Sequence, residues 1–196
     1  MEKDLLSLAQ DIYGLSKKAG LLTAESFSEV FPDQKIKKLD QDINRDKNIF
    51  LENNRDINDS ESLWELGVQY KIRENLLQIM MDFLQEKGKA FMVNWDQPVE
   101  DIVYNFKTVN TGLPISDLGE KQVDGQWYQG VEIEGKPYWY PASPEGYVPE
   151  VLGEIGKHLQ KLSLVIVCLK AGDENQYTVI GEELLPEFEK FDFSTV

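Results

Sequence analysis

Residues 60–95 read SESLWELGVQYKIRENLLQIMMDFLQEKGKAFMVNW, and a change of hydrophobic period within this stretch decides the fold. Up to Lys87, apolar side chains recur at helical spacing, which predicts a long helix with Asp59 or Ser60 as a cap and Gly88 as a stop. Apolar residues cover most of its circumference, so we expect this helix to be buried between layers. The run KAFMVNW that follows predicts a β-strand.

The segment before this stretch predicts further helices. Residues 4–18 place their apolar side chains on one side, and Gly20 follows as a stop. A shorter helix is expected over 24–31, because a proline comes directly after it. Residues 33–58 are rich in Asp, Asn and Lys, and here we expect a helix near 33–42 followed by an exposed loop.

The segment after this stretch alternates short helices with strands. A continuous apolar run over 162–170 predicts the central strand of a sheet. In chain order we expect a helix from Pro98 to Val109, a loop over 110–118, a hairpin of strands 127–134 and 136–140, a helix over 148–161, and strands over 162–170 and 176–181.

These elements predict an α+β fold, in which a helical N-terminal half packs on a small mixed or antiparallel sheet of about four to six strands. We expect a single domain over 1–196, because the helix at 60–87 needs both halves of the chain to cover it. A division into a helical part, 1–88, and a sheet-containing part, 89–196, is the alternative.

The charge is strongly negative, with 35 Asp and Glu against 20 Lys and Arg and a net of −15. Residues 111–196 hold 15 acidic and 6 basic side chains, which gives −9 in that part alone. Such a field repels nucleic-acid phosphates and anionic membranes, so we expect neither as a partner. It attracts a basic protein, although an acidic surface that serves only solubility is the alternative.

The inventory of reactive residues is short. One cysteine, Cys168, excludes an internal disulfide, and one histidine, His158, excludes a site of several histidines. Cys168 lies in the most apolar strand, so we expect an inert buried thiol rather than a partner of His158. The first residues lack the pattern of a signal peptide and no apolar run could span a bilayer, so we expect a cytoplasmic protein without cofactor or metal.

Aromatic residues concentrate in residues 127–149, which hold six of the twelve Trp and Tyr side chains and half of the prolines. Rings with a polar tip on a stiff backbone favour recognition. Because side chains alternate along a strand, about half of these rings at most can face outward. We expect Trp127, Tyr138, Tyr140 and Tyr147 to be exposed and to bind a partner, whereas rings that only stabilise a hairpin are the alternative.

A carboxylate cluster, Asp96, Glu100 and Asp101, follows a predicted strand and begins the next helix. Carboxylates there could hold Mg²⁺ or act as acid and base, but we expect them to cap the helix. The runs from Asp40 and Asn54 imitate calcium loops, yet both lack the glycine that such a loop needs at its turn. We therefore predict no catalytic and no metal-binding residues.

These observations favour a non-enzymatic protein that recognises a basic protein through an acidic, aromatic-rich surface. In composition and charge the chain resembles bacterial immunity-type proteins, which cover the basic active site of a toxin. The alternative is a carboxylate-based hydrolase or a carbohydrate-binding domain, with Trp127, Trp139 or Tyr140 as a stacking platform near Asp96 and Glu100. Self-association through the aromatic face is a third hypothesis.

Overall fold

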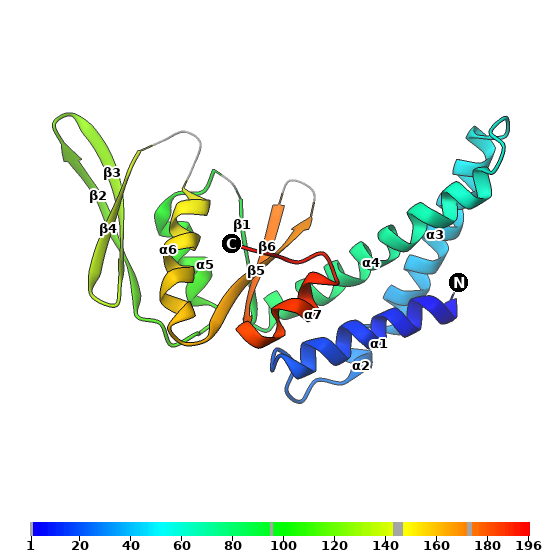
Figure 1. Ribbon diagram of the computed structural model, residues 1–196, viewed down its shortest axis with the longest axis horizontal. Coiled ribbons are helices and arrows are strands. Elements are labelled where there is room, and N and C mark those ends of the chain that lie inside the picture. The colour runs from blue at the N-terminus through cyan, green and yellow to red at the C-terminus, as the bar shows by residue number, and fades with distance from the viewer. Residues whose placement is uncertain (1, 95, 143–146, 172–173) are drawn as a thin grey trace. The chain divides into compact units, whose positions relative to one another are not determined.

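A computed structural model of the chain describes residues 2–94, 96–142, 147–171 and 174–196 (Figure 1). It confirms the α+β fold, because helices fill the N-terminal half and two antiparallel sheets follow. The chain divides into two compact units, Met1–Phe83 and Leu84–Val196, and the expectation of one domain stays a prediction. In the described residues, no helix has the length and apolar character needed to cross a bilayer.

The first unit consists of helices. Its elements are α1 (Glu2–Lys18), α2 (Phe27–Val30), α3 (Asp33–Asn53) and most of α4 (Ser60–Glu86). The stop after α1 is confirmed at Gly20, whose φ of 69° suits glycine. Helix α3 runs well past residue 42, where we expected a loop, and its later turns pack on α4 through the rings of Phe50 and Trp64, whose centroids lie 5.5 Å apart.

The long helix α4 is present as predicted, but it is not buried along its whole length. Leu77 is buried in the second half of the helix, whereas Leu63, Leu66 and Tyr70 in the first half are exposed, Leu66 at 79%. The reason is that α3 packs on the side of α4 that lies away from these three residues. There Lys71 of α4 pairs with Asp46 of α3. Because apolar residues cover most of its circumference, the helix was predicted to be buried between layers, and for its first half this expectation is corrected.

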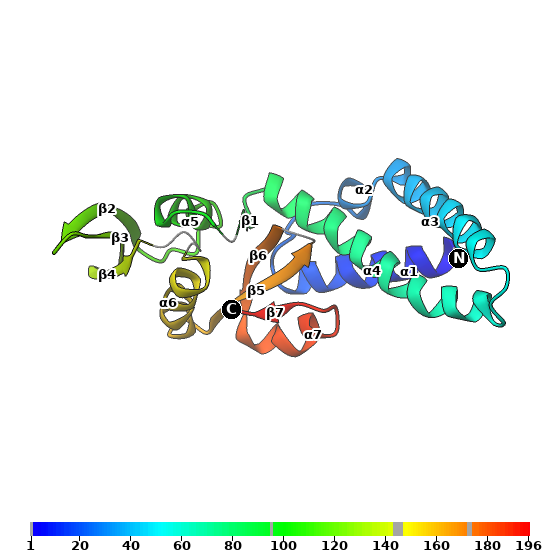
Figure 2. The same ribbon diagram turned by 90° about the horizontal axis from the view of Figure 1, so that it is seen from above.

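The second unit has a layer of two helices between two antiparallel sheets (Figures 1 and 2). Sheet A has the order β1-β6-β5-β7 and sheet B the order β2-β3-β4. The bounds are β1 Ala90–Val93, α5 Val99–Lys107, β2 Ile115–Val123, β3 Gln126–Ile133, β4 Lys136–Pro141, α6 Val148–Gln160, β5 Leu164–Ala171, β6 Glu174–Gly181 and β7 Ser194–Thr195; a 3₁₀ turn at Glu182–Leu184 leads into α7, Leu185–Glu189.

One hydrophobic core joins the three layers of this unit. It includes Phe91 of β1, Phe106 of α5, Val131 of β3 and Leu152 of α6, all at most 2% exposed. The prediction of a central strand over 162–170 is confirmed, because β5 pairs with β6 on one side and with β7 on the other. The hydrophobic effect therefore holds the helices against both sheets.

Strand β2 is the main difference from the sequence-based prediction, which placed a loop up to residue 118. Its side chains are mostly polar, and among them only Ile115 is buried. A polar strand at the edge of a sheet is held by its hydrogen bonds to β3 and leaves little hydrophobic pattern in the sequence. The strands form two separate sheets, whereas the sequence-based prediction had a single sheet.

Candidate functional site

The aromatic side chains of β4 divide between the two faces of sheet B. Tyr138 and Tyr140 lie on the inner face, towards α6, and both are half-buried against the core. Tyr147, just before α6, is only 6% exposed and its ring lies 6.2 Å from that of Tyr140. Exposure of these three residues was predicted and is corrected, because α6 covers the face on which Tyr138 and Tyr140 lie. Trp127 is exposed at 50%, as predicted.

Trp139 lies on the outer face of sheet B, opposite the face on which α5 and α6 pack. Its ring lies against Gly130 of β3, where an added Cβ would come within 2.7 Å of the ring. On its other side the amine of Lys121 lies 3.7 Å from a Trp139 ring centroid, a cation–π contact. The ring is thus held within sheet B between a glycine and a lysine.

Tyr138 also belongs to a polar cluster that joins sheet B to α6. The imidazole of His158 lies 2.9 Å from the Tyr138 hydroxyl through Nε2 and 2.5 Å from Glu134 through Nδ1. Lys161 donates to the same Glu134 carboxylate at 3.1 Å. These hydrogen bonds hold the pKa of Glu134 below its usual range, and the bond from His158 has the largest effect. Burial raises the pKa of the Tyr138 hydroxyl above its usual range.

The only cysteine has no visible role in a site. Cys168 is buried in β5, and burial raises the pKa of its thiol. A thiol with a raised pKa is less often the reactive thiolate. The two nitrogens of His158 are both engaged with Glu134 and Tyr138, so the structure gives no support to a Cys168–His158 pair.

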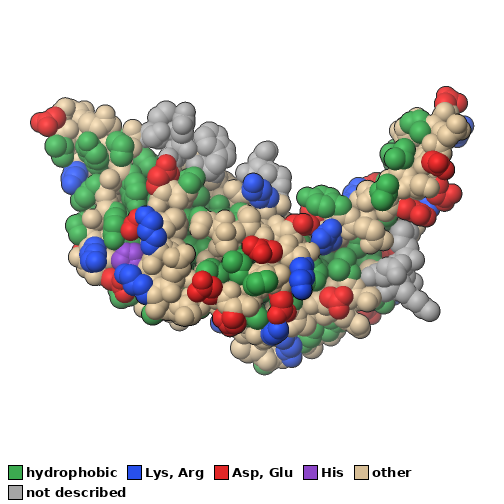
Figure 3. Space-filling view, viewed as in Figure 1, with side chains coloured by type: hydrophobic (Ala, Val, Ile, Leu, Met, Phe, Trp, Pro, Cys, Tyr) green, Lys and Arg blue, Asp and Glu red, His purple; other side chains and the backbone are tan. Residues whose placement is uncertain are grey.

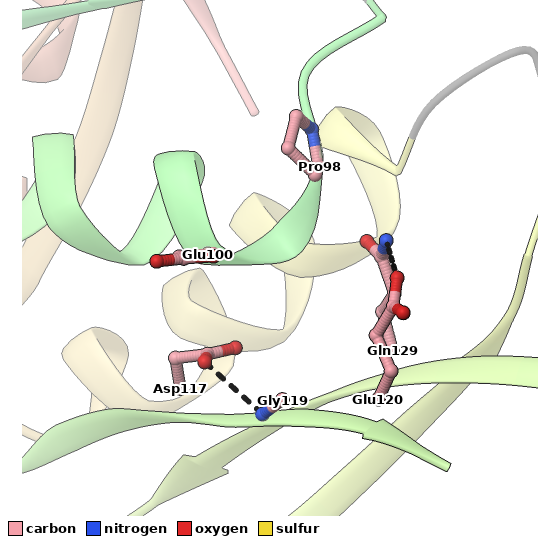
Figure 4. A pocket seen from close by; sticks show the side chains of 6 residues that line it. All are labelled: Pro98, Glu100, Asp117, Gly119, Glu120 and Gln129. Atoms are coloured by element: carbon pink, nitrogen blue, oxygen red, sulfur yellow. Dashed lines mark hydrogen bonds between the residues drawn. The ribbon is translucent and has the colours of Figure 1, made fainter.

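Carboxylates meet instead in a cleft between α5 and sheet B (Figure 4). Glu100 comes from the first turn of α5, and Asp117 and Glu120 come from β2. The cleft has a volume of about 250 Å³ and is lined by Pro98, Glu100, Asp117, Gly119, Glu120 and Gln129. Of the predicted carboxylate cluster, Glu100 lies here, whereas Asp96 lines no described part of this cleft.

A β-bulge explains how two carboxylates of β2 reach the same cleft. Asp117 and Glu120 are three positions apart, and in a regular strand such side chains point to opposite faces. The register shifts by one residue between Asp117 and Gly119, so both carboxylates lie on the inner face. Gly119 has a φ of 70°, and its N–H donates to the Asp117 carboxylate at 3.0 Å.

Gln129 of β3 links the two walls of the cleft. Its side-chain oxygen accepts from the Val99 N–H at the start of α5, at 3.0 Å. Its side-chain nitrogen donates to Glu120 at 2.9 Å, which fixes that carboxylate on the strand (Figure 4). Carboxylates were predicted to cap α5. At the Val99 N–H, the capping group is instead the side-chain amide of Gln129 from β3.

A second hollow of about 410 Å³ adjoins the cleft and shares two carboxylates with it. It is lined by Glu100, Asp101, Val103, Tyr104, Lys107 and Asp117. Among the described residues no group of three His, Cys, Asp or Glu side chains is placed to hold a metal ion. The cleft and the second hollow together are lined by four carboxylates and one lysine, Lys107. This excess of negative charge suits a cationic group.

Trp127 extends the same face of sheet B. It pairs with Gln122, and Gln129, two residues further along β3, pairs with Glu120. Residues directly opposite each other share a face, so Trp127, Gln129 and Glu120 all lie on the inner face. The exposed indole of Trp127 thus lies on the same face as Gln129 of the acidic cleft, two residues away along β3.

The sequence predicted Glu100 and Trp127 but missed Asp117 and Glu120. Both missed residues belong to β2, whose first part, up to residue 118, was expected to be a loop and whose remainder was assigned to no element. A signal for them exists in Gly119, because an isolated glycine within a polar run can mark a bulge in an edge strand.

A family model described as a domain of unknown function (DUF6630) matches residues 21–182 of the chain. The match spans most of the chain, and the chain therefore belongs to this family. No curated protein and no solved structure matches the chain.

Proposed function

We propose that this member of the DUF6630 family is a non-enzymatic cytoplasmic protein that binds a basic protein through the acidic inner face of sheet B. One observation carries the proposal: Glu100, Asp117 and Glu120 meet from two different elements in one cleft. Covering the basic active site of a toxin, as an immunity-type protein does, is one form of this function.

Two features of the surface favour a cationic ligand. The cleft brings three carboxylates together, and a lysine or arginine side chain would relieve their mutual repulsion. The exposed Trp127 lies on the same face and offers an aromatic ring, to which the same cations are attracted. Its place beside a charged cleft resembles the aromatic anchors and charged rim of protein interfaces.

The lining of the cleft supports binding rather than catalysis. Beside the carboxylates it holds one amide, one proline and one glycine. Gln129, which supplies the amide, donates to Glu120 and accepts from the backbone of α5. A nucleophile paired with a base, which covalent catalysis needs, is not among these residues.

Charge reversal in the cleft tests the proposal. We expect the immobilised protein to retain basic proteins from a cell lysate at low salt and to release them as the salt concentration rises. In the double variant Glu100→Lys with Glu120→Lys, affinity for each retained protein should fall at least about tenfold, since each reversed charge opposes a cation.

A control with the same net charge separates the site from the overall acidity. Glu182 and Glu189 are exposed and lie outside the cleft, so Glu182→Lys with Glu189→Lys should leave binding within about twofold of the unchanged protein. Equal losses in both double variants, or retention that salt does not weaken, would contradict the proposed function.

A further inference from the structure

The two edges of sheet B differ in whether they can accept another strand. Strand β4 forms one edge, and it carries Pro137 and Pro141, which pair with Glu132 and Tyr128 of β3. The Ala142 N–H donates to the Trp127 carbonyl at 2.7 Å. This bond determines which residue pairs of β3 and β4 are hydrogen-bonded to each other. In an antiparallel ladder, hydrogen-bonded pairs alternate with non-hydrogen-bonded pairs, here called open pairs. Counting from the hydrogen-bonded pair of Trp127 and Ala142, both prolines fall in open pairs, where a backbone N–H would point away from β3. The prolines therefore close this edge.

The edge formed by β2 has no such protection, because none of its strand residues is proline. The Trp127 carbonyl accepts from Ala142, just after β4, so the backbone of Trp127 points towards the β4 side and not towards β2. Trp127 and its partner Gln122 on β2 therefore form an open pair. By the same alternation, Glu120 opposite Gln129 is in an open pair. The backbone N–H and C=O of Gln122 and Glu120 then point away from β3, and no strand in the described part of the chain pairs with that edge.

The charges next to this edge select the strand that could pair with it. The side chains of Asp117 and Glu120 lie on the inner face at the cleft, and Glu100 faces them from α5. Side chains directly opposite on paired strands contact each other, and opposite charges there stabilise the pair. In an added strand, every second side chain would lie on this face, so basic residues at alternate positions would meet the carboxylates.

We propose that the free edge of β2 binds an extended basic segment of a partner protein as a fourth strand of sheet B. This inference rests on the proposed function and adds how the basic partner is recognised: backbone hydrogen bonds supply affinity, and lysine or arginine at every second position supplies specificity. A second copy of this chain is disfavoured, because β2 paired with β2 would bring like charges together.

The test uses a short synthetic peptide in which lysine alternates with threonine, titrated into the full chain. Gln122→Pro removes an N–H that points away from β3 and leaves the ladder to β3 intact. We expect this variant to bind the peptide about tenfold more weakly, from the lost hydrogen bond and the distorted edge. Gln122→Thr keeps the N–H and should bind as the unchanged protein does, and circular dichroism checks that both variants are folded.

A second measurement leaves the protein unchanged. The same peptide, with methyl groups on the backbone nitrogens of its threonines or of its lysines, keeps every charge but cannot donate along one of its edges. We expect one of the two methylated peptides to bind at least about tenfold more weakly than the parent peptide.

Three outcomes would overturn the edge-pairing proposal. If both methylated peptides and the Gln122→Pro variant bind as tightly as their controls, while Glu120→Lys abolishes binding, edge pairing is wrong and the proposed function stands. If the chain forms a dimer that Gln122→Pro dissolves, the occupant of the edge is a second copy. If neither the alternating peptide nor any basic protein binds, both proposals fail.

Discussion

The two sheets of the second unit differ in how much of their strands is buried. In sheet A, consecutive residues of β5 from Val165 to Leu169 are all buried, so both faces of this strand are covered. In sheet B, β2 has only Ile115 buried, and within the described part of this unit α5 and α6 both pack on the inner face of the sheet. A strand buried on both faces contributes to the core, whereas a mostly exposed edge strand contributes little to it and, under the proposed function, is available to a partner.

An aspartate placed in the central strand of sheet A should destabilise the protein far more than one placed in the edge strand β2 of sheet B. Val167 of β5 is fully buried, and Val167→Asp would bury an unpaired charge, which we expect to cost about 4 kcal/mol or more and to unfold the unit. Val123 of β2 is 45% exposed, and Val123→Asp should cost less than about 1 kcal/mol. Urea unfolding followed by circular dichroism measures both, and equal losses would mean that β2 is as buried as β5.

Gly130→Ala tests how tightly the outer face of sheet B is packed. The new Cβ would lie 2.7 Å from the Trp139 ring, which Lys121 holds from the other side. We expect a loss of about 1–3 kcal/mol in the free energy of unfolding, because the ring must shift. In the double variant with Trp139→Ala, the effect of the added methyl group should largely disappear. An unchanged effect in that double variant would show that the ring does not lie on Gly130.

A smaller, pH-dependent effect is expected for the polar cluster that joins sheet B to α6. Because the folded protein holds the pKa of Glu134 below its ordinary value of 4.5, this carboxylate stabilises the fold above that pH. The contribution is lost as the pH falls through the lowered pKa. Glu134→Gln should therefore be less stable than the unchanged protein at neutral pH, and the difference should shrink below about pH 4.5.

Thermal unfolding across this pH range measures the effect of Glu134. Glu132→Gln is the control, since Glu132 lies on the outer face of the same sheet, away from His158. A difference between Glu134→Gln and the unchanged protein that is constant from neutral to acidic pH would contradict the role given to the hydrogen bond from His158.

The aromatic hairpin shows what a strand pattern can and cannot predict. Alternation along 136–140 correctly places Tyr138 and Tyr140 on one face and Trp139 on the other, but it does not say which face is covered. The sequence-based interpretation exposed the two tyrosines, and the structure covers them with α6. The covering helix begins several residues after the hairpin, and nothing local to the strand records on which side it packs.

The cleft shows the same limit for charged residues. Glu100 was found because it begins a helix with a clear hydrophobic period. Its neighbours Asp117 and Glu120 come from a polar edge strand, and a bulge of one residue turns both towards α5. Asp117 and Glu120 are distant from Glu100 in the sequence. They become its neighbours only when β2 pairs with β3 and α5 packs on the inner face of sheet B.

The sequence by itself determined the α+β fold, the helices α1, α4, α5 and α6, and the apolar strand β5, because helical and strand periods are local properties of the chain. It also determined the acidity that favours a basic partner. Only the tertiary structure decided which face of sheet B is covered, which carboxylates meet, and which edge stays open. These depend on pairing and packing between distant segments, whose free energies no short stretch of sequence records.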